Sequence, residues 1–405
     1  MNDYKVRDLN LEYFSCATFL VAGAFFYPLP SILLLALVSP LLPRQFNRLC
    51  VPVVVIFLTV FYSSITPVND WVEYLKVYHG IQHGEISPLR HKNFGGGLEI
   101  GYPLFMLMVG TLSGYNDYAL FFASYALIFW LVAKFTEDLD PKFRLSFITF
   151  ACLGITFLIA ASYVIRQIVS VLLFLIAIQS SSRRNICTLF FLSAAFHISS
   201  IINIGVFLSY AFFSNQKIPK QYKLLGFLLL ITPLSFFLTK SLSYISEKFQ
   251  NIQQFETNQN TIAASHILLV ILNTMLIGLA LNIKSRSTAF FLLLLLKECL
   301  LFFALLPFPT LSFRLGLIIY AFPFFFIKDF LNNQEANKSI KHLIYFLMIF
   351  INFAPSIYAL HLSSQELNSL NFFNSQAFSS NILDITAHAL STIQASPIPL
   401  QLHAP

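Results

Sequence analysis

Residues 145–179 read LSFITFACLGITFLIAASYVIRQIVSVLLFLIAIQ, and Arg166 is the only charged side chain among them. A single helix of this length would extend about 52 Å, whereas the hydrocarbon core of a bilayer is about 30 Å thick. The stretch therefore predicts two membrane segments, with a break near residues 160–163. The break would place Arg166 close to the start of the second helix.

The composition of the whole chain agrees with a membrane environment. Of its 405 residues 57% are hydrophobic and only 11% are charged, and 46 are phenylalanine. Soluble domains carry roughly 25% charged residues, so these few charges cannot cover a water-soluble surface. The sequence predicts an all-α fold, a polytopic bundle of transmembrane helices.

Apolar windows of helical length predict about 10 to 12 spans. The first window is interrupted by Pro28 and Pro30, so it forms either one kinked helix or two short ones. The candidate spans are 12–42, 49–66, 100–115, 117–134, 145–162, 163–180, 186–213, 223–239, 263–283, 288–306, 311–330 and 342–361.

Between and after these spans lie three polar regions. We expect one bundle over residues 1–361, with an external loop at 67–98 and a second polar loop at 240–262. The tail at 362–405 is rich in Ser and Asn and is expected to be weakly ordered. The first span has no small-residue cleavage motif after it and is expected to be retained.

Basic residues in short loops predict the orientation of the chain. Arg44 with Arg48, and Arg183 with Arg184, indicate cytoplasmic turns. Four full crossings between the external loop and Arg183 would return the chain to the external side. One segment within 99–180 therefore does not cross completely, and 100–115 is the shortest candidate.

Several other classes of function are not indicated. The net charge of +7 is spread over short clusters between apolar runs, which argues against nucleic-acid binding. The five cysteines are scattered and include no C-x-x-C pair, so neither a disulfide nor a zinc site is expected. No compact cluster of Asp, Glu and His demands a metal, and no cofactor is expected.

Ionisable groups inside apolar spans are costly and usually face a partner or a wet cavity. Arg166 is either a snorkelling interfacial arginine or a clamp for an anion such as a phosphate. His197 is either a neutral histidine hydrogen-bonded between helices, or a polar contact to a substrate or a proton shuttle. Arg314 follows two prolines that break a helix. Lys297 and Glu298 interrupt an apolar run and are expected to pair with groups on other helices in a structural role.

The external loop contains a short amphipathic segment. Asn69 can cap a helix that begins at Asp70, which would place Asp70 and Tyr74 on one face. The glycines at 95–97 lack the Lys-Ser/Thr of a phosphate loop, and Glu99 follows them at the edge of the next apolar run. A carboxylate at this boundary can accept a proton from an incoming hydroxyl.

Five motifs occur in a fixed order along the chain: Asp70-x-x-x-Tyr74, Glu99-x-Gly-Tyr102, Ile-Arg166-Gln167, Phe-His197-x-Ser and Arg314 in the last third. In this order they resemble the EpsG family of membrane proteins, many of which are assigned as Wzy-type polymerases of exopolysaccharide, capsule or O-antigen. The sequence departs from that pattern just before Asp70, where Pro67-Val-Asn69 stands and the family often has an arginine.

The resemblance implies a role for each motif residue. The first external loop is similar to that of GT-C glycosyltransferases, which makes Asp70 the first choice of catalytic base and Glu99 the second. The family pattern places Arg166 and Arg314 at a lipid diphosphate and His197 near the sugar. Gln167, Tyr74 and Tyr102 are the remaining candidates for substrate contact.

The function implied is the joining of oligosaccharide repeat units carried on undecaprenyl diphosphate, at the bacterial cytoplasmic (inner) membrane. Membrane lipids, and a chain-length regulator and a flippase of the same pathway, are the expected partners. Two alternatives remain open at this stage. One is a GT-C-like transferase that adds a single sugar from a lipid-phosphate donor, and the other is a polysaccharide-related transporter or flippase.

Overall fold

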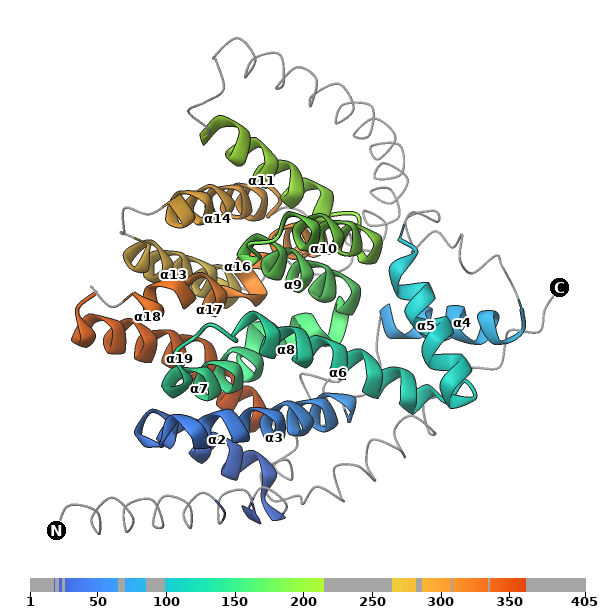
Figure 1. Cartoon of the computed structure of the whole chain (residues 1–405), viewed down its shortest axis with the longest axis horizontal. Coiled ribbons are helices and arrows are strands. Elements are labelled where there is room, and N and C mark those ends of the chain that lie inside the picture. The colour runs from blue at the N-terminus through green and yellow to red at the C-terminus, as the bar shows by residue number, and fades with distance from the viewer. Residues whose placement is uncertain are drawn as a thin grey trace. The chain divides into compact units, whose positions relative to one another are not determined.

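The structure, a computed structural model, describes Thr18, Ala22, Gly23 and residues 26–64, 70–84, 99–214, 264–281, 286–306, 309–333 and 336–361, with only the backbone given at some helix ends. Within these ranges every regular element is helical, which confirms the all-α prediction (Figure 1). The loop 240–262, the span 223–239, the tail 362–405 and most of the loop 67–98 lie outside the described residues.

The helices form two compact units, the first containing the chain up to Ser200 and again from Ala321. Its elements are α2 (Pro28–Val38), the 3-10 turn η1 (Ser39–Leu41), α3 (Arg44–Ser63), α4 (Asp70–Gln82), α5 (Gly101–Ser113), α6 (Asp117–Phe135), α7 (Pro141–Leu153), α8 (Ile155–Tyr163), α9 (Ile165–Gln179), α10 (Arg183–Phe196), α17 (Pro323–Phe326), α18 (Lys328–Asn332) and α19 (Lys338–His361). The second unit, Ile201–Tyr320, contains α11 (Ser200–Ser214), α13 (Ala264–Ala280), α14 (Arg286–Ala304), α15 (Pro309–Leu315) and α16 (Leu317–Ala321).

Three of the described helices are long and apolar enough to cross a membrane, namely α3, α6 and the Lys338–Ser356 part of α19. The pair α7 and α8 adds a fourth if its two helices, bent by 61° to one another, count as one span. Shorter apolar helices accompany them, including α5, α9 and α13. The chain is a multi-pass membrane protein, and the figure of 10 to 12 crossings stays a prediction.

The stretch 145–179 folds as two helices on either side of the predicted break. The helix α8 ends at Tyr163, Val164 leaves the helical conformation with φ −132° and ψ 49°, and α9 begins at Ile165. This confirms the break and makes Arg166 the second residue of α9. A further bend, which the sequence analysis did not predict, lies at Gly154, where ψ of 138° separates α7 from α8.

Two other predicted spans are wrong as single helices. The span 186–213 is interrupted at His197, whose extended backbone (φ −156°, ψ 127°) separates α10 from α11. The span 311–330 is divided into short helices, and Pro323 at the start of α17 contributes to that division because a proline cannot continue the preceding hydrogen-bond ladder.

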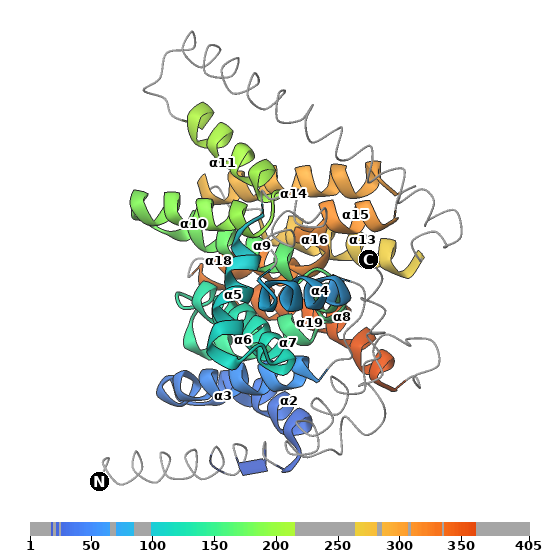
Figure 2. The same ribbon diagram turned by 90° about the vertical axis from the view of Figure 1, so that its right-hand side faces the viewer.

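At the centre of the first unit lies α9, packed between α10 on one side and α6 and α8 on the other (Figure 1). Eleven consecutive residues, Ile165–Leu175, are buried. Figure 2 shows α5 beside α4 and α6, so α4, which begins at Asp70, and α5, which Glu99 precedes by two residues, are neighbours.

The last helix of the described residues, α19, is fixed to α7 by side-chain hydrogen bonds. The hydroxyl of Ser356 donates to the Leu153 carbonyl at 2.7 Å, and Tyr345 donates to Ser146 at 2.9 Å. The buried Lys328 of α18 donates to the Phe135 carbonyl at 2.9 Å. These bonds hold the chain that returns from residue 321 against the N-terminal helices.

Candidate functional site

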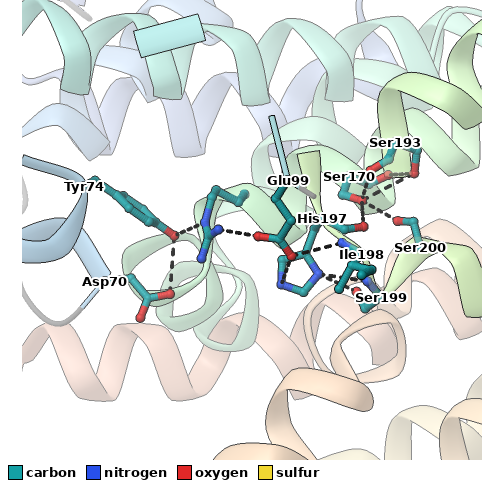
Figure 3. Close-up of polar contacts among 10 residues, drawn as sticks. Asp70, Tyr74, Glu99, Ser170, Ser193, His197, Ile198, Ser199 and Ser200 are labelled. Atoms are coloured by element: carbon teal, nitrogen blue, oxygen red, sulfur yellow. Dashed lines mark hydrogen bonds and ion pairs between the residues drawn. The ribbon is translucent and has the colours of Figure 1, made fainter. Parts of the chain in front are cut away.

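The two ends of α4 are fixed differently. At its start Asp70 is half-buried, and the hydroxyl of Tyr74, one helical turn later, donates to its Oδ2 at 3.3 Å (Figure 3). The shared face predicted for Asp70 and Tyr74 is thus confirmed. Asn69, proposed as the cap of this helix, lies outside the described residues.

The far end of α4 is attached to the α5–α6 turn. Tyr78 contacts Ser113 Oγ and donates to the Asn116 carbonyl, both at 3.3 Å. His79 Nε2 lies 3.0 Å from Asp117 Oδ1, and this hydrogen bond raises the pKa of His79 above its ordinary value of 6.5. Burial raises the pKa of Tyr78.

Arg166 connects α4 to the residue just before α5. Its Nε donates to the Tyr74 hydroxyl at 3.1 Å, and its guanidinium carbon lies 5.2 Å from the Tyr74 ring centre. Its Nη1 forms an ion pair with Glu99 Oε2, and both side chains are only 4% exposed. Because an isolated buried charge is expensive, each partner offsets part of the cost of burying the other.

The second carboxylate oxygen of Glu99 reaches the break between α10 and α11. Glu99 Oε1 accepts a hydrogen bond from the Ile198 amide at 3.1 Å and lies 3.7 Å from His197 Nε2 (Figure 3). The break at residues 197–199 turns the Ile198 amide toward the carboxylate instead of into the helix. Glu99 therefore bridges Arg166 and a backbone donor.

The hydrogen bonds of His197 determine which of its ring nitrogens carries the proton. The Ser199 amide donates to Nδ1 at 3.2 Å, and Ser199 Oγ lies 2.7 Å from the same nitrogen. A backbone N–H can only donate, so Nδ1 is the acceptor and the proton of the neutral ring is assigned to Nε2. That N–H faces Glu99.

We call Asp70, Tyr74, Glu99, Arg166 and His197 the polar network. It places both predicted carboxylates and three of the predicted substrate contacts in one connected chain within the first unit. Two carboxylates, one guanidinium and one imidazole are thus linked through these contacts. A carboxylate in such a position can accept a proton from a hydroxyl.

Three serines behind the network were not predicted. The hydroxyl of Ser170 on α9 donates to the Ser193 carbonyl at 2.6 Å, and Ser193 Oγ donates to the Ser170 carbonyl at 2.7 Å. Ser170 also contacts Ser200 at the start of α11. Small hydroxyl residues in apolar helices commonly form hydrogen bonds between helices in membranes. The presence of serines in these apolar helices could therefore have predicted the contact.

Tyr102 and Gln167 are buried beside the network. The ring centre of Tyr102 lies 5.0 Å from that of Tyr74, and its hydroxyl lies 3.0 Å from Ser124 Oγ. Gln167 follows Arg166 on α9 and is 4% exposed. Both residues pack in the interior, and their predicted contact with a substrate stays a prediction.

The glycine of the Glu99-x-Gly-Tyr motif has a steric role. A Cβ atom at Gly101 would lie 2.9 Å from Phe196 Cδ2 and 3.0 Å from the backbone carbonyl carbon of Ala195. Only glycine therefore lets α5 approach α10 this closely, and that approach brings Glu99 to His197.

Arg314 belongs to the second unit, where it is half-buried in the last turn of α15. Its assignment to a lipid diphosphate stays a prediction. In the same unit Lys297 forms an ion pair with Glu298 and donates to Asn203 Oδ1. Asn203 lies on α11, so the expected contact of Lys297 with another helix is present.

The described part of the chain has no group of three or more His, Cys, Asp or Glu side chains that could hold a metal ion. Four of the cysteines, Cys50, Cys152, Cys187 and Cys299, are free thiols there. The fifth, Cys16, lies outside the described residues.

Comparison with known proteins places the chain in a family. No curated protein and no solved structure matches it. A sequence model of one family, however, matches residues 13–375, which is most of the chain. Such a match supports a polysaccharide-polymerase-like function and a lipid-linked oligosaccharide substrate in general terms. The protein belongs to the EpsG family.

Proposed function

We propose that the protein is a repeat-unit polymerase of a bacterial surface polysaccharide, an O-antigen, a capsule or an exopolysaccharide. It would join oligosaccharides carried on undecaprenyl diphosphate at the outer face of the cytoplasmic membrane. The observation that carries the proposal is the polar network, in which Asp70 and Glu99 are connected through Arg166 inside an apolar helix bundle of an EpsG-family chain. Intramembrane charges of this kind are usually functional.

The reaction requires one bond to form and one to break. A hydroxyl at the non-reducing end of one repeat unit attacks the anomeric carbon of the chain that is being extended. The bond from that carbon to the diphosphate oxygen breaks, the lipid diphosphate leaves with the bonding electron pair, and the hydroxyl proton passes to a carboxylate. The products are the lengthened chain and the free lipid diphosphate.

Asp70 is the stronger candidate for the base. It is half-buried at the first residue of α4, where a substrate hydroxyl can reach it, whereas Glu99 is 4% exposed and paired with Arg166. Tyr74 orients the Asp70 carboxylate, and Arg166 orients Tyr74. Glu99 and Arg166 are then principally positioning residues in this proposal.

The pairing with Glu99 also bears on the leaving group. Because Glu99 balances part of its charge, Arg166 offers a diphosphate less attraction than an unpaired arginine would. We therefore assign Arg166 first to holding Tyr74 and only second to the diphosphate. Arg314 and the Nε2–H of His197 are the further candidates for contact with the substrate.

The test is Asp70→Asn, with Glu73→Gln as the matched control. Glu73 lies on the same helix and pairs with Lys76 at 3.0 Å, so its replacement removes the same kind of charge away from the network. Loss of a general base should lower polymerisation at least about a hundredfold. Gel analysis of the surface polysaccharide should then show single repeat units with Asp70→Asn and a full ladder with Glu73→Gln.

Two results would contradict the proposal. A full ladder from Asp70→Asn at normal protein level would remove Asp70 from catalysis. Lipid-linked oligosaccharides from a deletion strain that lack one sugar, instead of accumulating as complete repeat units, would indicate a single-sugar transferase. Sugar transfer by the purified protein in detergent, without any gradient, would distinguish either enzyme from a transporter.

A further inference from the structure

A long groove runs along the first unit between α6, α9 and α10. Its volume is about 850 Å³, within the range of sites that hold small molecules. The middle of the groove is lined by aliphatic and aromatic side chains, and charged and amide side chains lie at one end. Trp130 on its rim is 58% exposed, so the groove opens sideways toward the surroundings of the bundle.

The wall formed by α9 begins at the polar network. Val169, Leu173, Ile176 and Ser180 line the groove, and with Arg166 they are spaced by three, four, three and four residues. Residues at this spacing share one face of a helix. The face of α9 that carries Arg166 at its first turn therefore continues as the groove wall.

The other two walls converge on the same end. On α10 the lining residues reach Phe196, whose ring centre lies 6.4 Å from that of Tyr102 and which directly precedes His197. On α6 they reach Leu127, one turn from the Ser124 hydroxyl that contacts Tyr102. One end of the groove is thus continuous with the polar network.

The opposite end of the groove carries charges of both signs. It contains Lys134 and Arg184, but also two carboxylates, Glu137 and Asp138. Lys134 is paired with Glu137 at 2.6 Å, and Asp138 is paired with Lys328. These pairs use both carboxylates, so of the two lining cations only Arg184 is left to attract a negatively charged phospholipid head.

We infer that the groove binds the first isoprene units of the polyprenyl chain of the lipid-linked substrate, with the diphosphate at the polar-network end. This inference rests on the proposed function. From Val169 to Ser180 the α9 wall extends about 16 Å, close to half of the roughly 30 Å hydrocarbon core. The chain enters sideways past Trp130, and the rest of the polyprenyl tail stays in the bilayer.

The test is photolabelling of the full-length protein in nanodiscs. The probe is a polyprenyl diphosphate without sugar, carrying a diazirine on its second isoprene unit. We expect labelled peptides from α6, α9 and α10. An excess of unlabelled undecaprenyl diphosphate should remove the labelling, whereas an excess of phosphatidylethanolamine or phosphatidylglycerol should not.

Two pairs of neighbouring residues on α10 supply matched variants. Thr188 lines the groove and its exposed neighbour Cys187 does not, so Thr188→Trp fills the groove and Cys187→Trp is its control. Leu192→Trp and Phe191→Trp form the second pair, at residues that are 38% and 68% exposed. Because all four residues are at least partly exposed, their replacement leaves the core intact.

The expected result is labelling about tenfold weaker in both groove variants, with both controls at the wild-type level. Equal labelling of groove and control variants would overturn the inference, and so would equal competition by phospholipid. The probe needs no polymerisation, so the two proposals can fail separately. Groove labelling with no polymer formed would refute only the proposed function, and polymer formation with unaffected groove variants would refute only the groove.

Discussion

Glu99 and Arg166, 67 positions apart in the sequence, form an ion pair in which each side chain is only 4% exposed. The pair joins the start of α5 to the first turn of α9 and connects to α4 through Tyr74. It therefore determines how three separate helices meet around Asp70.

Removal of either partner should destabilise the protein strongly. Glu99→Gln or Arg166→Met leaves a buried charge without its counterpart, which typically costs about 3–5 kcal/mol. The double variant removes both charges, so its loss should be smaller than the sum of the two single losses. Thermal unfolding in detergent measures all three variants, and additive losses would show that the pair is not coupled.

A methyl group at Gly101 should separate α5 from α10. The added Cβ would meet Phe196 at 2.9 Å and the Ala195 backbone at 3.0 Å, and overpacking of this kind typically costs about 1–3 kcal/mol. Gly278→Ala on α13 is the control, because its Cβ would have nothing within 4 Å, and alanine in a helix is favoured by up to about 1 kcal/mol. Opposite shifts of the unfolding temperature are expected, and a neutral Gly101→Ala would contradict the close approach.

The His79–Asp117 contact should make the attachment of α4 depend on pH. The pKa of His79 is raised in the folded protein, so its contribution is complete below its ordinary value of 6.5 and is lost as pH rises through the raised pKa. Wild type should therefore unfold at a higher temperature than His79→Gln at about pH 5.5, and the difference should vanish near about pH 8.5. His83→Gln, at the exposed end of the same segment, is the control.

An equal difference between wild type and His79→Gln at both pH values would contradict this assignment. Such a result would mean that the imidazole stabilises α4 by packing alone. Hydrogen exchange of the α4 amides, compared between variants at each pH, would show whether the loss is confined to this helix.

Much of the polar network could be predicted because ionisable residues are rare in membrane helices and are usually functional where they occur. Arg166 and His197 stand out against apolar helices, and the length of 145–179 alone requires the break before Arg166. Asp70 and Tyr74 follow from helical spacing in a polar loop. Each of these inferences uses only neighbouring residues.

The remaining features depend on partners that are distant in the sequence. The helix breaks at His197 without a glycine or proline there that would predict it. At the break the Ile198 amide donates to Glu99, and the Ser170 hydroxyl donates to the His197 carbonyl. The pairing of Glu99 with Arg166 is equally hidden, because local spacing cannot reveal a contact across 67 positions. The steric need for Gly101 becomes visible only once α10 lies beside it.

The bond from the Ile198 amide to Glu99 has a consequence for how related chains vary. Glu99 accepts this bond from the backbone amide of residue 198, and the isoleucine side chain takes no part in it. Many amino acids can therefore occupy this position while the donor persists, and proline alone, which lacks the hydrogen, would abolish it. A residue that supports the site can thus drift freely in evolution, and a search for invariant positions would pass over it.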